Sequence, residues 1–232
     1  MGASVIALHD IENLAKTLEH AAPEEIIRVA VEQIPNLTLA CSFGAEDMVL
    51  VDMLMKINPN ASVFYLDTDV LFQETYDLRD RAIERYGLRH LTQVRPELTL
   101  EEQAAAHGDE LWKRDPNACC SIRKVQPLTN ILKQYDGWIT GIRRDQAPTR
   151  ANAQVFEWDA KFELVKVNPL ALWTSEQVWS YIRDYDVPYN PLHDQGYPSI
   201  GCLHCTRPVK PGEDPRSGRW AGFEKTECGL HK

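Results

Sequence analysis

The chain has 232 residues, 44% of them hydrophobic, which is typical of a globular protein with a sizeable buried core. Its formal net charge of -9 argues against nucleic acid and anionic membranes as partners. No run of about 18 apolar residues appears, and the start lacks the features of a signal peptide, so we expect a cytoplasmic protein.

The first part of the chain alternates between helical and strand-like patterns. Residues 1–35 predict helices, and Pro23 suits a helix start. Short apolar runs then predict three strands, "LTLACS", "SVFYLDTD" and "LTQVRP". The segments between them predict helices, "EDMVLVDMLMKI" and "QETYDLRDRAIERYG", the second ending at Gly87. This alternation predicts an α/β fold, an open, mostly parallel twisted sheet with helices on both faces.

The second part is less regular. We expect a short helix in "TLEEQAAAH", irregular chain in "GDELWKRDPNACC" and a helix in "SIRKVQPLTNILKQY". Two further strands are predicted in "GWITGI" and "FELVKVNPL", and Thr174 with Gln177 predicts a capping box for the next helix. From Val187 onward Pro and Gly predict an irregular segment with a mobile tail. We expect one domain, with a helical preamble (1–35), a core (36–186) and a C-terminal segment (187–232).

Polar residues follow the first two predicted strands. "ACSFGAED" lies where the first strand gives way to a helix, which is the natural ligand site of an open parallel sheet. Backbone N–H groups there favour phosphate or sulfate, Ser42 adds a hydroxyl and Gly44 permits close approach. After the second strand, Asp67, Thr68 and Asp69 could hold a ribose or a base. The alternatives are an ordinary strand-to-helix turn and helix capping.

Four of the six cysteines form a Cys-Cys plus Cys-x-x-Cys set, Cys119, Cys120, Cys202 and Cys205. Four thiolates suit tetrahedral zinc or an iron-sulfur cluster, and adjacent ligands fit the separated corners of a cubane better than one zinc ion. The alternatives for the second pair are a thioredoxin-like redox motif and inert thiols, and nearby Pro and Gly argue against the redox motif.

The remaining features are two cysteines and three basic segments. Cys41 is expected in the core, whereas Cys228 lies near the C-terminus, where a mobile thiol could move between a substrate and an external partner. Its alternative is an unused surface cysteine. The segments "IRKVQP", "GIRRDQAPTR" and "TRPVKPGEDPRSGRW" suit a small anionic ligand, or else form solvated surface.

From about residue 38 to the C-terminus the sequence resembles the assimilatory adenylyl-sulfate reductases, members of the adenosine phosphosulfate and phosphoadenosine phosphosulfate reductase family. The resemblance is carried by "SFGAED", "LDT", "CCSIRK", "TGIRRDQAPTR", "GCLHCTRPVKPGEDPRSGRW" and "ECGLH". It implies an adenine nucleotide alpha-hydrolase-like fold and a 4Fe-4S cluster on the four cysteines. The adjacent pair is typical of the cluster-containing branch.

The resemblance also implies a reaction, the reduction of adenosine 5'-phosphosulfate in sulfate assimilation and cysteine biosynthesis. Cys228 would attack the sulfur of the substrate, AMP would leave, and thioredoxin or glutaredoxin would release sulfite from the S-sulfocysteine. His231 could assist Cys228, and its alternative is a merely solvated histidine of the tail. The implied substrate-binding residues are Ser42, Phe43, Gly44, Asp67, Thr68, Lys124, Arg143, Arg144, Arg216 and Arg219.

Two departures from the family pattern bear on specificity. Asp69 stands where Gly is more common, and Ala147 stands where Ser is common. Reduction of 3'-phosphoadenosine 5'-phosphosulfate, alone or as a second activity, stays open. Other classes are a tRNA-thiolating enzyme, which the acidic charge and "SFGAED" argue against, and a non-catalytic zinc module. The sequence also leaves open whether the protein forms a homo-oligomer.

Overall fold

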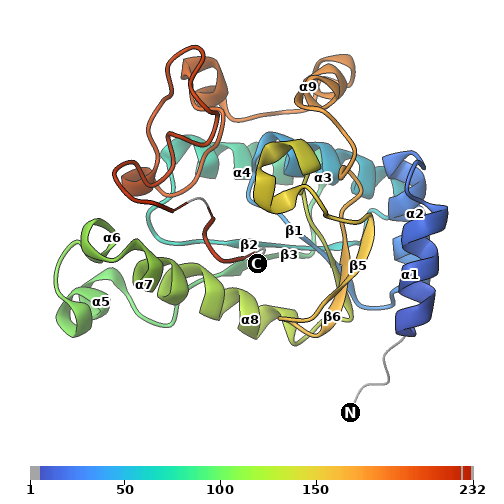
Figure 1. Cartoon of the computed structure of the whole chain (residues 1–232), viewed down its shortest axis with the longest axis horizontal. Coiled ribbons are helices and arrows are strands. Elements are labelled where there is room, and N and C mark those ends of the chain that lie inside the picture. The colour runs from blue at the N-terminus through green and yellow to red at the C-terminus, as the bar shows by residue number, and fades with distance from the viewer. Residues whose placement is uncertain (1–5, 226, 231–232) are drawn as a thin grey trace. The chain divides into compact units, whose positions relative to one another are not determined.

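The computed structural model describes residues 6–225 and 227–230 (Figure 1). Two compact units make up the chain, and each is assembled from three separate stretches of sequence. The sheet unit consists of Met1–Tyr65, Asp80–Thr92 and Leu132–Tyr189. The cysteine unit consists of Leu66–Arg79, Gln93–Ile131 and Asn190–Lys232. The expected organisation as one domain stays a prediction.

A six-stranded sheet in the order β3-β2-β1-β4-β6-β5 forms the core of the sheet unit. Its strands are β1 (Leu37–Ala40), β2 (Ser62–Leu66), β3 (Leu91–Val94), β4 (Gly137–Ile139), β5 (Phe156–Asp159) and β6 (Leu164–Val167). β1 pairs in parallel with β2 and β4, and β4 pairs in parallel with β6. Only the edge strand β5 is antiparallel to its neighbour β6 among the pairings described. The sheet confirms the predicted mostly parallel α/β fold.

Helices of the sheet unit cover the buried strands. They are α1 (Leu8–Thr17), α2 (Pro23–Gln33), α3 (Ala45–Ile57) and α9 (Ser175–Asp184). A further helix, α4 (Gln73–Tyr86), begins in the cysteine unit and ends in the sheet unit. α3 packs against both α2 and α9, and the three helices lie on the same side of the sheet (Figure 1). Ten residues of α3 are buried, as expected for a helix that is apolar on nearly every face. This packing fixes the start of α3 at the carboxyl end of β1.

Several local predictions are confirmed by the structure. Pro23 is the first residue of α2, and Thr174 and Gln177 form the predicted capping box of α9. Gly87 follows the last residue of α4 with a φ of 60°, a left-handed conformation that favours glycine. Cys41 is buried, as predicted.

Two segments differ from the expectations. β5 was not predicted, because its two carboxylates conceal a short edge strand with only its first residue fully buried. The segment expected to be irregular forms the short helices α6 (Leu111–Arg114) and α7 (Pro116–Cys120). Asp115 accepts hydrogen bonds from the amides of Asn117 and Ala118, and Pro116 is the first helical residue, so a start signal was present.

The cysteine unit contains two more helices, α5 (Leu100–His107) and α8 (Gln126–Leu132), the latter ending in the sheet unit. A π-helical stretch, Ser121–Val125, joins α7 to α8. Beyond Val187 the described chain forms short 3₁₀ turns and isolated β-bridges, in line with the predicted irregular segment. Within the residues described, no helix is both long and apolar enough to cross a membrane.

Candidate active site

The loop between β1 and α3 carries the first predicted site residues. The backbone amide and the hydroxyl of Ser42 both donate to the Asp47 carboxylate at 2.6 Å. Phe43 has a φ of 58°, and its ring packs edge-on against Tyr65 at a centroid distance of 5.4 Å. Gly44 is the N-cap residue of α3. The loop therefore has a fixed shape that turns the backbone into the start of a helix, where anions bind favourably.

Asp47 holds this loop, although sequence reasoning did not assign it a role. Burial raises its pKa to about 6, while the hydrogen bonds from Ser42 and the charge of Arg150 oppose that rise, and the charge of Glu46 adds to it. A carboxyl that titrates near neutral pH makes the loop sensitive to protonation. The "ED" that follows "SFGA" was the available signal.

Arg143 and Arg144 also lie in the sheet unit, in the loop after β4. Arg143 is buried and donates to Glu46 at 3.0 Å, to Asp145 and to the Trp173 carbonyl. Its charge is thus engaged by carboxylates of the protein, and an anionic ligand would have to exchange with them. The assignment of this residue to a phosphosulfate stays a prediction.

Arg144 is engaged in a similar way. Its Nε donates to the Ala153 carbonyl at 2.7 Å, and its Nη1 pairs with Glu19 at 2.8 Å. Gln146, a residue that sequence reasoning did not single out, donates to Glu46 at 2.9 Å and accepts from Arg150 at 2.6 Å. The loop after β4 is therefore a network of polar contacts that extends to the start of α3.

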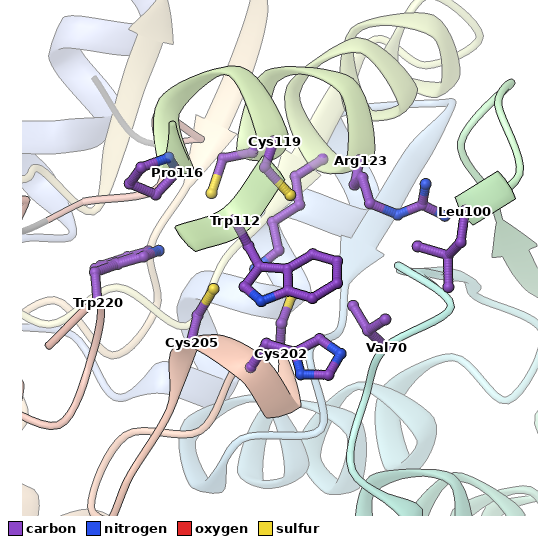
Figure 2. Close-up of a pocket in the computed structure, with 12 residues that line it drawn as sticks. Val70, Leu100, Trp112, Pro116, Cys119, Arg123, Cys202, Cys205 and Trp220 are labelled. Carbon is purple, nitrogen blue, oxygen red and sulfur yellow. The ribbon is translucent and has the colours of Figure 1, made fainter. Parts of the chain in front are cut away.

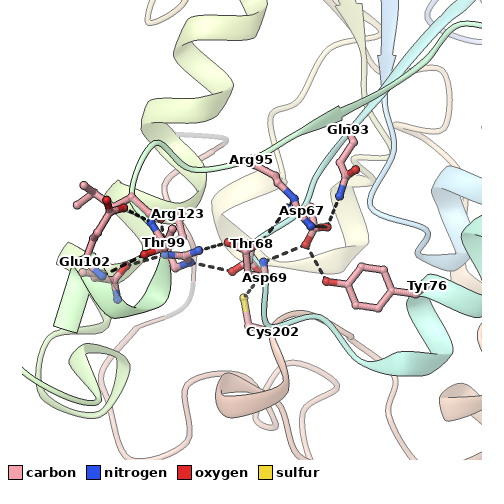
Figure 3. A network of polar contacts seen from close by, with 12 residues as sticks. Asp67, Thr68, Asp69, Tyr76, Gln93, Arg95, Thr99, Glu102, Arg123 and Cys202 are labelled. Atoms are coloured by element: carbon pink, nitrogen blue, oxygen red, sulfur yellow. Dashed lines mark hydrogen bonds and ion pairs between the residues drawn. The ribbon is translucent and has the colours of Figure 1, made fainter. Parts of the chain in front are cut away.

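Asp67 and Thr68 follow β2 and belong to the cysteine unit. The buried Asp67 carboxylate accepts from the Asp69 amide at 2.9 Å, the Tyr76 hydroxyl at 2.7 Å and the Gln93 amide at 2.5 Å. Arg95 lies 3.8 Å away (Figure 3). Burial and the bond to Asp67 raise the pKa of Tyr76. These contacts shape the loop itself, and the predicted contact of Asp67 with a ribose stays a prediction.

Figure 2 shows that the second site is a pocket lined by all four of the predicted ligand cysteines. Cys119 and Cys120 end α7, while Cys202 precedes a 3₁₀ turn and Cys205 is the last residue of that turn. The remaining lining is mainly apolar and contains two cations, and these residues are Val70, Leu100, Trp112, Pro116, Arg123, Lys124, His204 and Trp220. Two segments that lie far apart in the sequence thus contribute two thiols each to one enclosed space.

The turn that carries Cys202 and Cys205 is held from two sides. The Leu203 amide donates to the Val70 carbonyl at 2.8 Å, which attaches the turn to the loop after β2. His204 stacks on Trp112 with a centroid distance of 4.3 Å and an interplanar angle of 10°. The Trp220 amide donates to the Cys205 carbonyl at 3.0 Å. These contacts fix the second cysteine pair beside the pocket.

The thiols differ in their electrostatics. Burial, and then the charges of neighbouring cysteines, raise the pKa of Cys119 to about 11 and that of Cys205 to about 12, and burial also raises the pKa of Cys120. Burial acts in the same direction on Cys202, but Lys124, the Thr68 hydroxyl and Arg219 outweigh it and lower the pKa of Cys202. Thiolates at Cys119, Cys120 and Cys205 would therefore require added positive charge.

Lys124 is the cation at the centre of these interactions. Burial alone would lower its pKa, but the thiol groups of Cys202, Cys228 and Cys120 raise it, with Arg219 opposing them. Within residues 6–225 and 227–230, no group of three or more His, Cys, Asp or Glu side chains is placed to hold a metal ion.

The C-terminal residues described lie against the cysteine unit. Cys228 is half-buried, and its thiol interacts electrostatically with Lys124 and Cys120. Glu227 is buried and pairs with Arg216 at 3.2 Å. His231 lies outside the described residues.

Arg219, the other predicted cation of this segment, lies over the Trp220 ring at 4.6 Å and donates to the Ser199 hydroxyl at 3.1 Å. Its Nε is buried without a hydrogen-bond partner among the described residues. The structure therefore brings Lys124, Arg219 and three of the predicted functional cysteines into mutual electrostatic reach within one unit.

A family model described as the phosphoadenosine phosphosulfate reductase domain matches residues 36–208. The chain belongs to this reductase family. A relative from Halalkalibacterium halodurans named adenosine 5'-phosphosulfate reductase is 51% identical over 224 residues, which cover 96% of this chain and 97% of the relative. One from Gloeobacter violaceus named phosphoadenosine 5'-phosphosulfate reductase is 50% identical, covering 95% and 93%.

The fold of this family member agrees with a solved structure of the same family. The phosphoadenylyl-sulfate reductase of Candida auris, in a phosphate complex, is 34% identical with a TM-score of 0.78, covering 87% of this chain and 98% of that one. The expected family, the adenine nucleotide alpha-hydrolase-like fold and the class of oxidoreductase acting on a sulfur group are confirmed.

Proposed function

We propose that this chain reduces adenosine 5'-phosphosulfate to sulfite and AMP through an S-sulfocysteine at Cys228. The Cys228 thiolate attacks the sulfur of the substrate, the bond from sulfur to the phosphate oxygen breaks, and AMP leaves with the electron pair. A thiolate of the reductant then attacks Cys228 Sγ, and sulfite leaves with the electrons of the S–S bond. A second thiol of the reductant, thioredoxin or glutaredoxin, then attacks this mixed disulfide, which frees the Cys228 thiolate and leaves the reductant with an internal disulfide.

The observation that carries this proposal is the interaction of Cys228 with Lys124. Lys124 also lines the four-cysteine pocket and acts on Cys202, so the same cation interacts with the predicted nucleophile and with the predicted ligand set. The same ammonium group would attract the sulfate end of the substrate. Relatives about half identical over nearly the whole chain, named for this reaction, give independent support.

The pocket thiols fit a 4Fe-4S cluster by the chemistry of their donor set. Four free cysteines line one space within an apolar surround, and the raised pKa values of Cys119, Cys120 and Cys205 call for the positive charge that iron supplies. Cys119, Cys120, Cys202 and Cys205 would hold the cluster. When bound, it would cross-link the two cysteine segments and place a fixed charge near Lys124.

Arg219 is the cation best supported as a phosphosulfate ligand, whereas Arg216 would first have to exchange its ion pair with Glu227 for the anion. Both belong to the cysteine unit, and the charge of Arg219 acts on Lys124 and Cys202. Guanidinium groups match phosphosulfate oxygens and would stabilise the charge that develops on the departing phosphate. Ser42, Phe43 and Gly44 would hold the nucleotide phosphate through the start of α3.

A second candidate is the reduction of 3'-phosphoadenosine 5'-phosphosulfate, alone or together with the first activity. It is favoured by the Gloeobacter violaceus relative and the Candida auris structure, whose names give that substrate. A cytoplasmic location forms part of the proposal, and the six free cysteines support it.

Mass spectrometry of the anaerobically purified protein, incubated with adenosine 5'-phosphosulfate and no reductant, tests the proposal. We expect one added sulfo group on the wild type and none on a Cys228→Ser variant. Adduct formation only with the 3'-phosphorylated nucleotide would favour the second candidate. An adduct that persists in Cys228→Ser would overturn the assignment of the nucleophile.

A further inference from the structure

The side chain of Arg123 is almost wholly buried and belongs to the π-helical stretch, three residues after Cys120. Its Nε donates to the Thr68 carbonyl at 2.8 Å, and its Nη1 donates to the Leu98 carbonyl and to Gln103 Oε1, both at 3.2 Å. Three of its four hydrogen-bond partners described are thus neutral. Its Nη2 donates to the Asp69 carboxylate.

Among the ion pairs of the described residues, the counter-ion of Arg123 is the Asp69 carboxylate. The other oxygen of this carboxylate lies 3.6 Å from Arg95 Nε. The backbone of Asp69 has a φ of 59°, in the left-handed region that Asp and Asn adopt more readily than most residues. Its amide donates to the Asp67 carboxylate, which keeps the loop in this conformation (Figure 3).

The same loop contacts the other cysteine pair. The Thr68 hydroxyl lies 3.3 Å from Cys202 Sγ, and Leu71 and Cys202 form an antiparallel bridge. One face of the loop is therefore bonded to the helical segment that carries Cys119 and Cys120. The other face is bonded to the turn that carries Cys202.

We propose that Asp69 is a positioning residue of the four-cysteine pocket. Its carboxylate neutralises Arg123 and so fixes the loop that joins the two cysteine pairs before any metal binds. The proposal deepens the proposed function and rests on it only for the role of the four cysteines as ligands. A buried guanidinium without a counter-ion is unfavourable, so removal of this one charge loosens the whole connection.

An Asp69→Asn variant tests the role of the charge, because Asn tolerates the left-handed backbone and keeps a hydrogen-bond acceptor. The matched control is Asp186→Asn. Asp186 also has a positive φ, 51°, and pairs with Arg85 at 3.3 Å, but its side chain is 99% exposed. The two variants thus remove the same charge from the same backbone conformation, once at the pocket and once on the surface.

Alkylation of each cysteine in the reduced, metal-free protein, followed by mass spectrometry, is the measurement. We expect Asp69→Asn to raise the alkylation rate of Cys202 and Cys119 about tenfold, since the ion pair with Arg123 is reduced to a hydrogen bond with a neutral acceptor. The buried Cys41 of the sheet unit serves as the internal reference, and its rate should not change. Unchanged rates at the pocket, or an equal rise at Cys41, would overturn the positioning role.

An Asp69→Gly variant separates charge from backbone strain. Glycine adopts the left-handed conformation without steric strain. If backbone strain at residue 69 controlled the alkylation rate, the pocket cysteines of Asp69→Gly would be alkylated as slowly as those of the wild type, or more slowly. The proposal predicts the same rise in alkylation as in Asp69→Asn. Protection equal to the wild type in Asp69→Gly would overturn it.

Iron release to a chelator, measured on anaerobically reconstituted protein, gives a second readout that does not depend on activity. We expect release about tenfold faster from Asp69→Asn than from Asp186→Asn. Equal release rates would count against the role of Asp69. A wild type that takes up no iron would overturn the proposed cofactor, whereas the alkylation rates would still decide the positioning role.

Discussion

Glu227 Oε2 lies 3.2 Å from Arg216 Nη2, in an ion pair that is one residue away from Cys228. The Glu227 side chain is 2% exposed and that of Arg216 is 18% exposed, so the pair is well shielded from water. Removal of one partner from a shielded ion pair destabilises a protein more than removal of one partner from a surface pair, because it leaves an uncompensated charge. The pair therefore holds the Cys228 segment against the cysteine unit.

Replacement of Glu227 by Gln should loosen this segment. We expect Cys228 to be alkylated severalfold faster in Glu227→Gln, because the charge-assisted bond to Arg216 is lost. Glu224→Gln is the matched control, since Glu224 is an exposed residue of the same segment. Identical alkylation rates of Cys228 in the two variants would show that the ion pair does not hold the segment.

Protonation of Asp47 should make the stability of the protein depend on pH. Burial raises the Asp47 pKa from 3.8 to about 6, so the folded state binds this proton more tightly than the unfolded state does. The resulting stabilisation is complete below pH 3.8 and is lost as the pH rises through about 6. The side chain in Asp47→Asn stays neutral at every pH. Relative to this variant, the free energy of unfolding of the wild type should fall by on the order of 2–3 kcal/mol between about pH 4 and pH 7.

Urea unfolding of the metal-free wild type and Asp47→Asn across this pH range measures the effect. A Ser42→Ala variant adds a check of the sign, because the Ser42 hydroxyl donates to Asp47 and favours its ionised form. Loss of the Ser42 hydroxyl should therefore shift the fall in the free energy of unfolding to higher pH. A stability difference between wild type and Asp47→Asn that does not vary with pH would contradict the prediction.

Gly141 follows β4, and a side chain there should disturb the loop after β1. A Cβ atom at Gly141 would collide with Asp47 Oδ1 and would lie 3.0 Å from the Glu46 Cβ. We expect Gly141→Ala to cost about 1–3 kcal/mol in the free energy of unfolding and to weaken AMP binding. Combining it with Asp47→Ala should relieve the collision, so the double variant should cost less than the sum of the two single variants. Strict additivity would show that the two sites are independent.

Much of the fold could be predicted because the patterns that carry it are local. The buried runs of β1 and β2, the capping box at Thr174 and the helix end at Gly87 each depend on residues within a few positions of one another. β5 was missed because its formation depends on pairing with β6, and two carboxylates conceal its pattern.

The site was predictable in its thiols and not in its supporting contacts. Cysteines are few and their spacing is informative, so the four cysteines that line the pocket could be grouped from the sequence. Asp69 and Arg123 are 54 residues apart, and only the tertiary structure shows that they pair. Arg143 was predicted as a phosphosulfate ligand from the family resemblance and from its guanidinium group, whereas the structure shows carboxylates at that group.

Replacement of one pocket cysteine should separate the stabilisation that a bound cluster provides from the stabilisation that side-chain packing provides. Cys205→Ser should lower the iron content of the anaerobically reconstituted protein and lower its Tm by roughly 5–10 °C relative to the reconstituted wild type. The metal-free forms should differ much less, because serine is close to cysteine in size and Cys205 is only half-buried. Cys41→Ala is the control, since it removes a buried thiol far in the sequence from the four predicted ligands and should leave the iron content unchanged. Full iron content with an unaltered Tm in Cys205→Ser would exclude Cys205 as a ligand.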